Sequence, residues 1–222
     1  MLSIIVPTLN EARTIAPVLK RLEPLRRGGT EVIVVDGGSD DDTAVLARPL
    51  ADRVIEAPRG RASQMNAGAA AAAGDMLLFL HADTVLPEGA DALVDAGHAW
   101  GRFDVRIDGR HSLLRLVASM MNVRSRLTGV CTGDQAIFVR RALFTEIGGY
   151  PDIPLMEDIA LSKALRRRAP PWCLRQRVTT SGRRWEARGV ARTILLMWRL
   201  RFDYWRGVDP RALAVRYGYR PR

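Results

Sequence analysis

The sequence predicts an α/β fold with a Rossmann-like, mostly parallel central sheet and helices on both faces. Short apolar runs alternate with amphipathic helical patterns through the first hundred residues, and polar residues directly follow the runs. Alternation of this kind is typical of right-handed crossovers, which build parallel sheets. At 222 residues and 47% hydrophobic content, the chain is long enough for one domain with a sizeable core.

The first half supplies most of the expected sheet. The run at residues 31–36 is almost entirely apolar, as in a parallel strand covered on both faces. After Thr14, a plausible N-cap, apolar residues from Ile15 to Leu25 share one helical face. We expect strands at residues 2–7, 31–36, 53–56 and 76–81, and helices after Thr14, at 41–50 and at 61–73.

Beyond residue 100 the regular alternation of strand and helix patterns ends, and the chain closes with a basic helical segment. We expect strands at 103–107, 136–139 and 172–178, and helices at 113–127, 157–168 and 189–205. The helix at 113–127 should face inward through Leu113, Leu116, Val117 and Met120. The last helix carries Ile194, Met197, Trp198, Phe202 and Trp205 on one face and Arg188, Arg192, Arg199 and Arg206 on another. We expect the apolar face to pack on the domain, with peripheral membrane contact or a homodimer left open.

The net charge of +10 favours anionic partners, because the bases gather in the second half while the first half is richer in acids. No apolar run approaches the ~20 residues that cross a bilayer. The start of the chain enters a strand without a basic segment, so we expect no signal peptide. Two cysteines, Cys131 and Cys173, are too few for a disulfide framework or a multi-cysteine metal site. The expected location is the cytoplasm, with the inner face of the membrane as a variant.

Polar residues gather where the expected strands end. Thr8 to Glu11 follow the first strand, Asp36 ends the second, and His81 to Asp83 follow the run at 76–81. Ligands of open parallel sheets bind beyond the carboxyl ends of the strands, so these residues form a candidate site. Capping of the following helices is the alternative explanation for the acids.

A phosphate-bearing ligand would need positive charge or N–H donors. The chain has no G-x-G-x-x-G after its first strand and no P-loop, which disfavours classical dinucleotide dehydrogenases and NTPases. A Mg²⁺ or Mn²⁺ ion that bridges a diphosphate to a carboxylate is the alternative, and Asp83 suits it. His81 points to the same side of an extended segment, as a second ligand or a hydrogen-bonding partner.

Several motifs in sequence resemble those of glycosyltransferase family 2, whose fold is GT-A. The motifs are Ser3–Glu11, Val34–Thr43 and Phe79–Asp83, and the resemblance extends over nearly the whole chain. It is closest to a small bacterial branch associated with arsenosugar biosynthesis genes, which shares Leu80–Thr84, Gly133–Gln135 and Met156–Asp158.

The resemblance implies a role for each matching residue of the nucleotide site. The nucleotide-binding residues would be Pro7, Thr8, Asn10, Glu11, Asp36, Gly60, Arg61 and Gln64. Asp36 would accept a hydrogen bond from the base, and Arg61 would lie near the diphosphate. Asp83 occupies the last position of the family's D-x-D metal motif, and His81 replaces the first acid.

The resemblance also implies the catalytic and acceptor residues. Asp158 would take the proton from the acceptor hydroxyl, with Glu157 beside it. Stabilisation of the helix N-terminus is the alternative role for both. Gly133, Asp134 and Gln135 would face the donor sugar or acceptor, and Arg184 and Trp185 would hold the diphosphate and stack on the acceptor. Ser181 replaces the Gln of the Q-x-x-R-W motif of processive members, which argues against a polymerising enzyme.

The sequence therefore predicts an inverting, metal-dependent hexosyltransferase that uses a nucleotide sugar, with a UDP-sugar favoured, and a small or lipid-linked acceptor. Residues 1–100 would be the nucleotide-binding half of one domain, 101–186 the acceptor and catalytic half, and 187–222 a basic helical tail. A nucleotidyltransferase acting on sugar phosphates is an alternative, but it would carry a Gly-rich loop after the first strand. A non-enzymatic nucleic-acid-binding module is suggested only by the basic half, and we expect no nucleic-acid partner.

Overall fold

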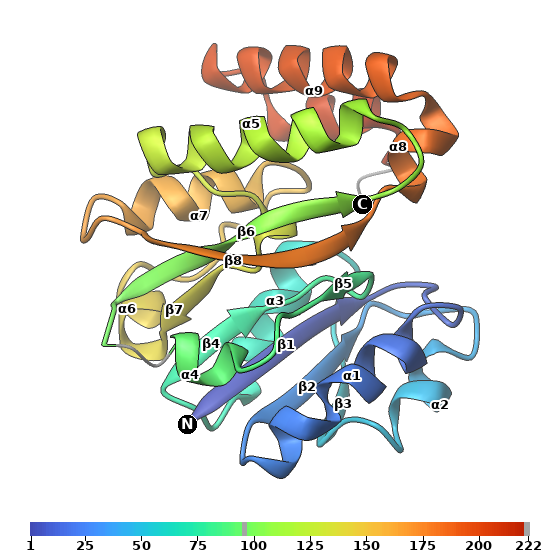
Figure 1. The fold of residues 1–222 in the computed structure, drawn as a ribbon, viewed down its shortest axis with the longest axis vertical. Coiled ribbons are helices and arrows are strands. Elements are labelled where there is room, and N and C mark those ends of the chain that lie inside the picture. Colours follow the sequence, from blue (N-terminus) through green and yellow to red (C-terminus); the bar gives the residue numbers. More distant parts are fainter. Residues whose placement is uncertain (95–96, 220–222) are drawn as a thin grey trace.

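The computed structural model describes residues 1–94 and 97–219, and its strands form one curled sheet (Figure 1). Across the described residues the strand order is β3-β2-β1-β4-β7-β6-β8-β5. The strands are β1 (Leu2–Thr8), β2 (Glu31–Asp36), β3 (Arg53–Glu56), β4 (Met76–Phe79), β5 (Thr84–Val85), β6 (Trp100–Asp108), β7 (Phe138–Arg140) and β8 (Trp172–Ser181). The first four strands and the β6–β8 pair are parallel, whereas β7 and β5 pair antiparallel with their neighbours. The predicted α/β fold with a mostly parallel sheet is confirmed.

The helices pack on both faces of this sheet. They are α1 (Ile15–Arg27), α2 (Thr43–Ala47), α3 (Arg61–Ala71), α4 (Ala90–Val94), α5 (Leu113–Thr128), α6 (Arg141–Glu146), α7 (Glu157–Leu165), α8 (Arg183–Arg188), α9 (Val190–Trp205) and α10 (Pro210–Tyr217), with a 3₁₀ turn η1 (Gly133–Gln135). Every strand and helix predicted from the sequence is present; β2 and β3 have the predicted bounds, and the other elements have at least one shifted end. The sequence did not predict five further elements, which are short or directly follow residues typical of turns. They are β5, α4, α6, α8 and α10.

The core has two layers because successive strand residues face opposite sides of the sheet. Ile4 and Val6 of β1 pack with α1 and α5, whereas Ile5 packs with α3, α6 and α7. Helix α3 lies close to the sheet because residue 68 is glycine, and a Cβ there would overlap the side chain of Ile5. This close approach positions the start of α3 at the end of β1.

The inward face predicted for the helix at 113–127 is partly wrong. Val117 is buried, but Leu116 and Met120 are 54% and 45% exposed. Helix α5 instead buries Leu114 and Met121 against the core. The periodicity identified an amphipathic helix correctly but assigned its buried face about one residue out of register.

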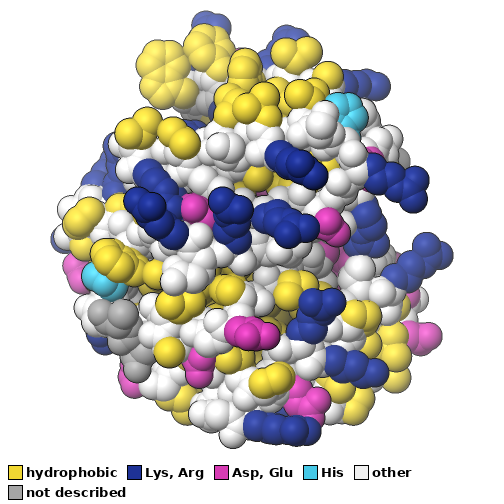
Figure 2. All heavy atoms as spheres, viewed as in Figure 1, with side chains coloured by type: hydrophobic (Ala, Val, Ile, Leu, Met, Phe, Trp, Pro, Cys, Tyr) yellow, Lys and Arg dark blue, Asp and Glu magenta, His cyan; other side chains and the backbone are white. Residues whose placement is uncertain are grey.

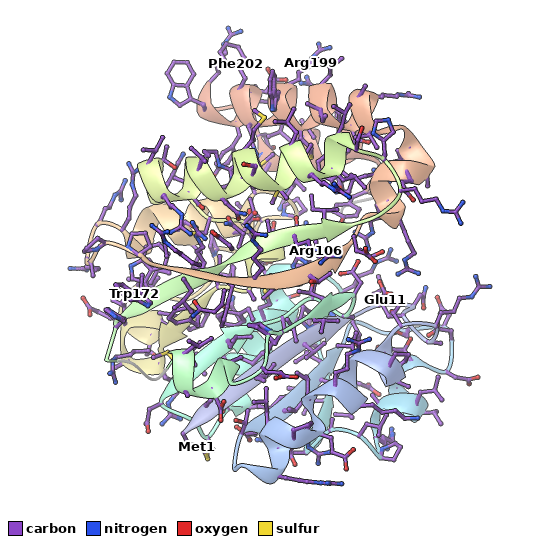
Figure 3. The ribbon with its side chains drawn as sticks, in the orientation of Figure 1. Met1, Glu11, Arg106, Trp172, Arg199 and Phe202 are labelled. Atoms are coloured by element: carbon purple, nitrogen blue, oxygen red, sulfur yellow. The ribbon has the colours of Figure 1, made fainter. Side chains whose placement is uncertain are left out.

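The packing predicted for the last helix is also largely wrong. Trp198, Phe202 and Trp205 are 55%, 54% and 75% exposed, whereas α9 buries Thr193 and Leu200. Figure 3 shows Phe202 and Arg199 projecting from the outer side of α9. Helices α5 and α9 lie side by side above β6 and β8 (Figure 1), so much of the predicted apolar face stays uncovered by the described chain.

After α9 the chain returns toward the sheet through α10, so that the basic tail does not extend away from the domain. Asp209 caps α10 by accepting a hydrogen bond from the Arg211 amide at 2.9 Å. Residues 220–222 of the predicted tail and residues 95 and 96 lie outside the described residues. Among the described helices, none has the length and apolar character needed to cross a membrane.

Candidate active site

A cavity of about 950 Å³ opens beyond the carboxyl ends of β1 and β4. One part is bounded by the loops after these strands and by the start of α3. The other part lies between α5 and α9, and the starts of η1 and α7 lie between the two. Of the predicted site residues, the following line it: Pro7, Thr8, Glu11, Gly60, Arg61, Gln64, His81, Asp83, Gly133, Asp134, Asp158, Arg184 and Trp185.

Asp36 and Asn10 hold the loop after β2 next to this cavity, and neither is among the residues that line it. Asp36, at the end of β2, accepts hydrogen bonds from the Gly38 amide at 3.0 Å and the Ser39 amide at 2.8 Å. Asn10 has a left-handed backbone with φ of 55°, and its side-chain oxygen accepts from the Asp40 amide at 2.9 Å. Both polar side chains therefore fix the shape of the rim.

Gln64 fastens α3 to the same rim from inside. Its amide nitrogen donates to the Thr8 carbonyl at 2.7 Å and to the Val35 carbonyl at 2.8 Å, and the side chain is 3% exposed. The Gly60 amide donates to its oxygen at 3.3 Å. Gln64 thus uses its polar atoms on the backbone, which fixes the position of Arg61 at the first turn of α3.

Arg61 on the cavity wall forms an ion pair with the buried Glu157, which does not itself line the cavity, with 2.9 Å between Nε and Oε1. Glu157 is 3% exposed, and its second oxygen has no hydrogen-bond partner among the described residues. Burial raises the pKa of Glu157, although Arg61 lowers it, and the net direction is upward. Burial acts to lower the pKa of Arg61, but the charge of Glu157, with smaller contributions from Tyr219, Asp158 and Tyr217, raises it. The net direction is upward, so the guanidinium stays charged.

Asp158, the next residue, lines the cavity. One oxygen accepts from the Gly133 amide at 2.9 Å, and the other accepts from the Ile159 amide at 2.7 Å. The preceding residue, Met156, has a left-handed φ of 70°, a conformation that costs energy for a side chain of this size. Two hydrogen bonds and a strained turn therefore fix this carboxylate in one orientation.

The two predicted metal ligands differ in how free their side chains are. Asp83 lines the cavity and accepts two long hydrogen bonds, from the Thr84 and Thr180 hydroxyls, each at 3.5 Å. The His81 ring lies between the η1 backbone and Asp134: a Cβ on Gly133 would come within 2.5 Å of Nε2, and Nδ1 is 3.3 Å from an Asp134 oxygen. Burial raises the pKa of Asp134, but the hydrogen bond and charge of His81, together with the charges of Arg61 and Arg184, lower it, and the net direction is downward.

These residues fit a divalent cation that takes most of its ligands from a substrate. No group of three His, Cys, Asp or Glu side chains suitable for a metal occurs in residues 1–94 and 97–219. Mg²⁺ and Mn²⁺ need only one or two protein carboxylates when phosphate oxygens and waters complete the shell. Asp83 can supply that carboxylate, whereas His81 already contacts Asp134.

Gln135, which we predicted to face the donor sugar or acceptor, does not line the cavity. It is fully buried, and its amide nitrogen donates to the Ser125 hydroxyl at 3.0 Å rather than into the cavity. Arg184 does line the cavity, 3.7 Å from an oxygen of Glu11, and Trp185 lines it alongside. Gln135 thus connects η1 to α5 and holds the turn that carries Gly133.

Sequence reasoning missed the residues that α5, α9 and α10 bring to the cavity. Tyr219, beyond α10, places its ring 5.8 Å from the Arg61 guanidinium, and Tyr217 also lines the wall. Arg124 of α5 and Arg201 of α9 line the cavity as well. The only sequence signal for these residues was the dense basic charge of the second half.

The fold and the site define the class: the chain is a domain of the GT-A fold, of the kind found in glycosyltransferases. It belongs to the family described as Glycosyl transferase family 2, whose sequence profile matches residues 3–143. Membership of this family favours glycosyl transfer over nucleotidyl transfer and over a non-enzymatic basic module.

Curated relatives and solved structures agree with this class. A PGL/p-HBAD biosynthesis glycosyltransferase of Mycobacterium bovis is 35% identical over 170 residues, covering 68% of this chain and 63% of that protein. The chain therefore spans a little under two thirds of that relative's length. Mannosyltransferase PcManGT from Pyrobaculum calidifontis, solved with GDP-Man and Mn²⁺, is 25% identical with a TM-score of 0.63, covering 99% of this chain and 65% of that one. S. aureus TarS shares the fold at 20% identity and a TM-score of 0.64, covering 82% of this chain and 60% of that one.

Proposed function

We propose that this chain transfers a sugar from a nucleoside diphosphate sugar to an acceptor hydroxyl with inversion at the anomeric carbon. The orientation of Asp158 is the observation that most supports the proposal. Its carboxylate is fixed by the Gly133 and Ile159 amides on the wall of a cavity that Asp83 and Arg61 also line. Base, metal ligand and cation thus share one cavity on the side where such sheets bind ligands.

In the proposed reaction the acceptor oxygen attacks the anomeric carbon as the bond from that carbon to the diphosphate oxygen breaks. Asp158 takes the proton of the attacking hydroxyl, and the electron pair of the broken bond leaves with the nucleoside diphosphate. Arg61 and Arg184 face the leaving diphosphate and stabilise its developing charge. Glu157 holds Arg61 in position through the buried ion pair.

We propose a Mg²⁺ or Mn²⁺ ion as the cofactor, held by Asp83. When bound, such an ion neutralises charge on the diphosphate oxygens. Solved proteins of the same fold support the choice, since glucosyl-3-phosphoglycerate synthase of Mycobacterium tuberculosis was solved with Mn²⁺ and UDP. His81 orients Asp134 in this proposal, because its ring already contacts that carboxylate.

The donor in this proposal is a UDP-sugar and the acceptor is a small or lipid-linked hydroxyl compound. TarS solved with UDP-GlcNAc supports the first choice, although PcManGT was solved with GDP-Man. The proposal keeps residues 1–100 as the donor half and residues 101–186 as the catalytic and acceptor half. A place in the branch associated with arsenosugar biosynthesis genes, contact of α9 with a membrane or a second copy, and a cytoplasmic location stay predictions.

A thermal-shift titration tests the proposal. The chain is heated with UDP, GDP, UDP-glucose and GDP-mannose, each with Mg²⁺, with Mn²⁺ and with a chelator. Stabilisation by nucleotides that depends on the metal supports the proposal, and stronger stabilisation by UDP selects the base. Asp83→Asn should reduce the metal-dependent part of the shift. A chain that responds to no nucleotide under any condition would refute the proposed function.

A further inference from the structure

The part of the cavity between α5 and α9 is apolar and open to the surface. Leu116 and Met120 line it from α5, and Met197 and Trp198 line it from α9. Leu116, Met120 and Trp198 are each about half exposed. Figure 2 shows hydrophobic side chains gathered over these two helices at the top of the molecule. Isolated exposed apolar residues are ordinary, but a contiguous apolar lining that continues into a cavity indicates a bound apolar group.

Two arginines line the same part of the cavity without an acidic partner among the described residues. Arg124 and Arg201 line it from α5 and α9. Two guanidinium nitrogens of Arg124 and the Nε of Arg201 are shielded from solvent and have no hydrogen-bond partner among the described residues. Neither side chain forms an ion pair within residues 1–94 and 97–219, in contrast to Arg61 on the wall of the same cavity, which is paired with Glu157.

Unpaired, partly buried cations are costly, because desolvation is not offset by a counter-charge. Burial lowers the pKa of Arg124, and the charge of Asp158 partly offsets this effect. Asp158 is thus the acidic group that acts most on Arg124, yet its carboxylate accepts from backbone amides. A ligand that brought its own anion would relieve the cost on both arginines.

We infer that the acceptor is an anionic amphiphile, whose acidic group binds Arg124 and Arg201 while its apolar chain lies between α5 and α9. This inference rests on the proposed function and specifies its acceptor. The site requires a compound that is both charged and apolar, such as an alkyl or prenyl phosphate, bound as a single molecule. The arginines lie within the cavity and not only on its rim, which favours a molecule that enters it over a flat bilayer surface.

The test is a binding titration by calorimetry with UDP and Mn²⁺ present. The probes are decyl phosphate, kept below its micelle concentration, inorganic phosphate and decyltrimethylammonium. We expect decyl phosphate to bind and the other two to bind at least roughly tenfold more weakly, because inorganic phosphate lacks the apolar chain and decyltrimethylammonium lacks the anion. Arg124→Gln and Arg201→Gln should each weaken decyl phosphate by roughly tenfold. Met120→Ser should weaken decyl phosphate but leave inorganic phosphate unchanged.

Arg199→Gln is the matched control, because Arg199 is on α9 but is exposed and points away from the cavity (Figure 3). It should bind decyl phosphate as the parent chain does. Equal affinity for decyl phosphate and decyltrimethylammonium, or unchanged affinity in both arginine variants, would overturn the inference. Equal affinity for inorganic phosphate and decyl phosphate would also overturn it, because the site would then bind the anion alone and not the apolar chain.

A third outcome separates this site from membrane docking. Sedimentation with anionic phosphatidylglycerol vesicles, without binding of monomeric decyl phosphate, would overturn the inference in favour of a membrane-docking surface. Failure of the inference and failure of the proposed function remain distinguishable, because UDP binding is titrated separately in each variant. A chain that binds UDP but not decyl phosphate loses only the acceptor class.

Discussion

Replacement of Asp158 by Asn tests the proposed base with the smallest change of shape. Asparagine keeps one oxygen but cannot accept a proton at neutral pH. General-base catalysis contributes roughly 10²–10⁴-fold, so we expect turnover to fall by that factor, or about 3–5 kcal/mol of barrier. The affinity for UDP should not change, because the base acts on the acceptor.

The structure adds a second effect that can be measured separately. Both oxygens of Asp158 accept from backbone amides, Gly133 at 2.9 Å and Ile159 at 2.7 Å. The amide nitrogen of asparagine must face one of these two donors, so one hydrogen bond is lost, at a cost of about 1–3 kcal/mol. We expect a lower free energy of unfolding in urea by that amount, with a folded variant at low urea.

The assay follows release of UDP from a UDP-sugar, with water or an alkyl phosphate as acceptor, and calorimetry reports UDP affinity. Asp152→Asn is the matched control, because Asp152 also lines the cavity but is exposed. It should keep turnover within a factor of about three of the parent. Turnover of the Asp158 variant that stays within that same range, in a folded chain that binds UDP, would refute the assignment of Asp158 as the base.

Three further predictions follow from burial. Burial raises the pKa of Cys131 to about 12, so alkylation of the native chain at pH 8 should label Cys173 and spare Cys131. Mass spectrometry measures the labelling of each cysteine, and equally fast labelling of both would contradict the prediction. Gly68→Ala should destabilise the chain by about 1–3 kcal/mol in urea because its Cβ meets Ile5, and an unchanged midpoint would contradict the close approach. The folded-state pKa of Glu157 lies above its usual 4.5, so the contribution of Glu157 to the free energy of unfolding should fall as the pH rises above that value. Glu157→Gln should remove this pH dependence. Parallel profiles of unfolding free energy against pH for the two chains would refute the prediction.

The sheet and the proposed donor side could be predicted because their signals are local. Each strand of the first half is a short apolar run, and its polar end marks where the chain leaves the sheet. Thr8, Glu11 and Asp83 follow these runs directly, so placing the strands also placed the residues. Asp36 also ends such a run, but it does not line the cavity, because its carboxylate accepts hydrogen bonds from the Gly38 and Ser39 amides. The order of residues cannot reveal these hydrogen bonds.

The proposed acceptor side could not be predicted because its signals are not local. Helical periodicity marks an apolar stripe on α5 and α9 but does not say what covers it. Leu116 and Trp198 face an opening between two helices far apart in sequence, so they resemble core residues until the helices are placed. Tyr219 reaches Arg61 only because α10 turns back, which depends on tertiary packing rather than on any motif.

The two ends of the cavity differ in how much positive charge they leave free. At the donor end Arg61 is paired with Glu157, and Arg184 lies 3.7 Å from Glu11, so both cations already face acids. A diphosphate that enters this end therefore needs additional positive charge, which a cation at Asp83 would supply. The other end retains Arg124 and Arg201 without acidic partners among the described residues. Removal of metal by a chelator should accordingly weaken UDP binding and leave decyl phosphate binding unchanged. Equal loss of both affinities in calorimetry would show that the end with Asp83 does not depend on the metal more than the end with Arg124 and Arg201.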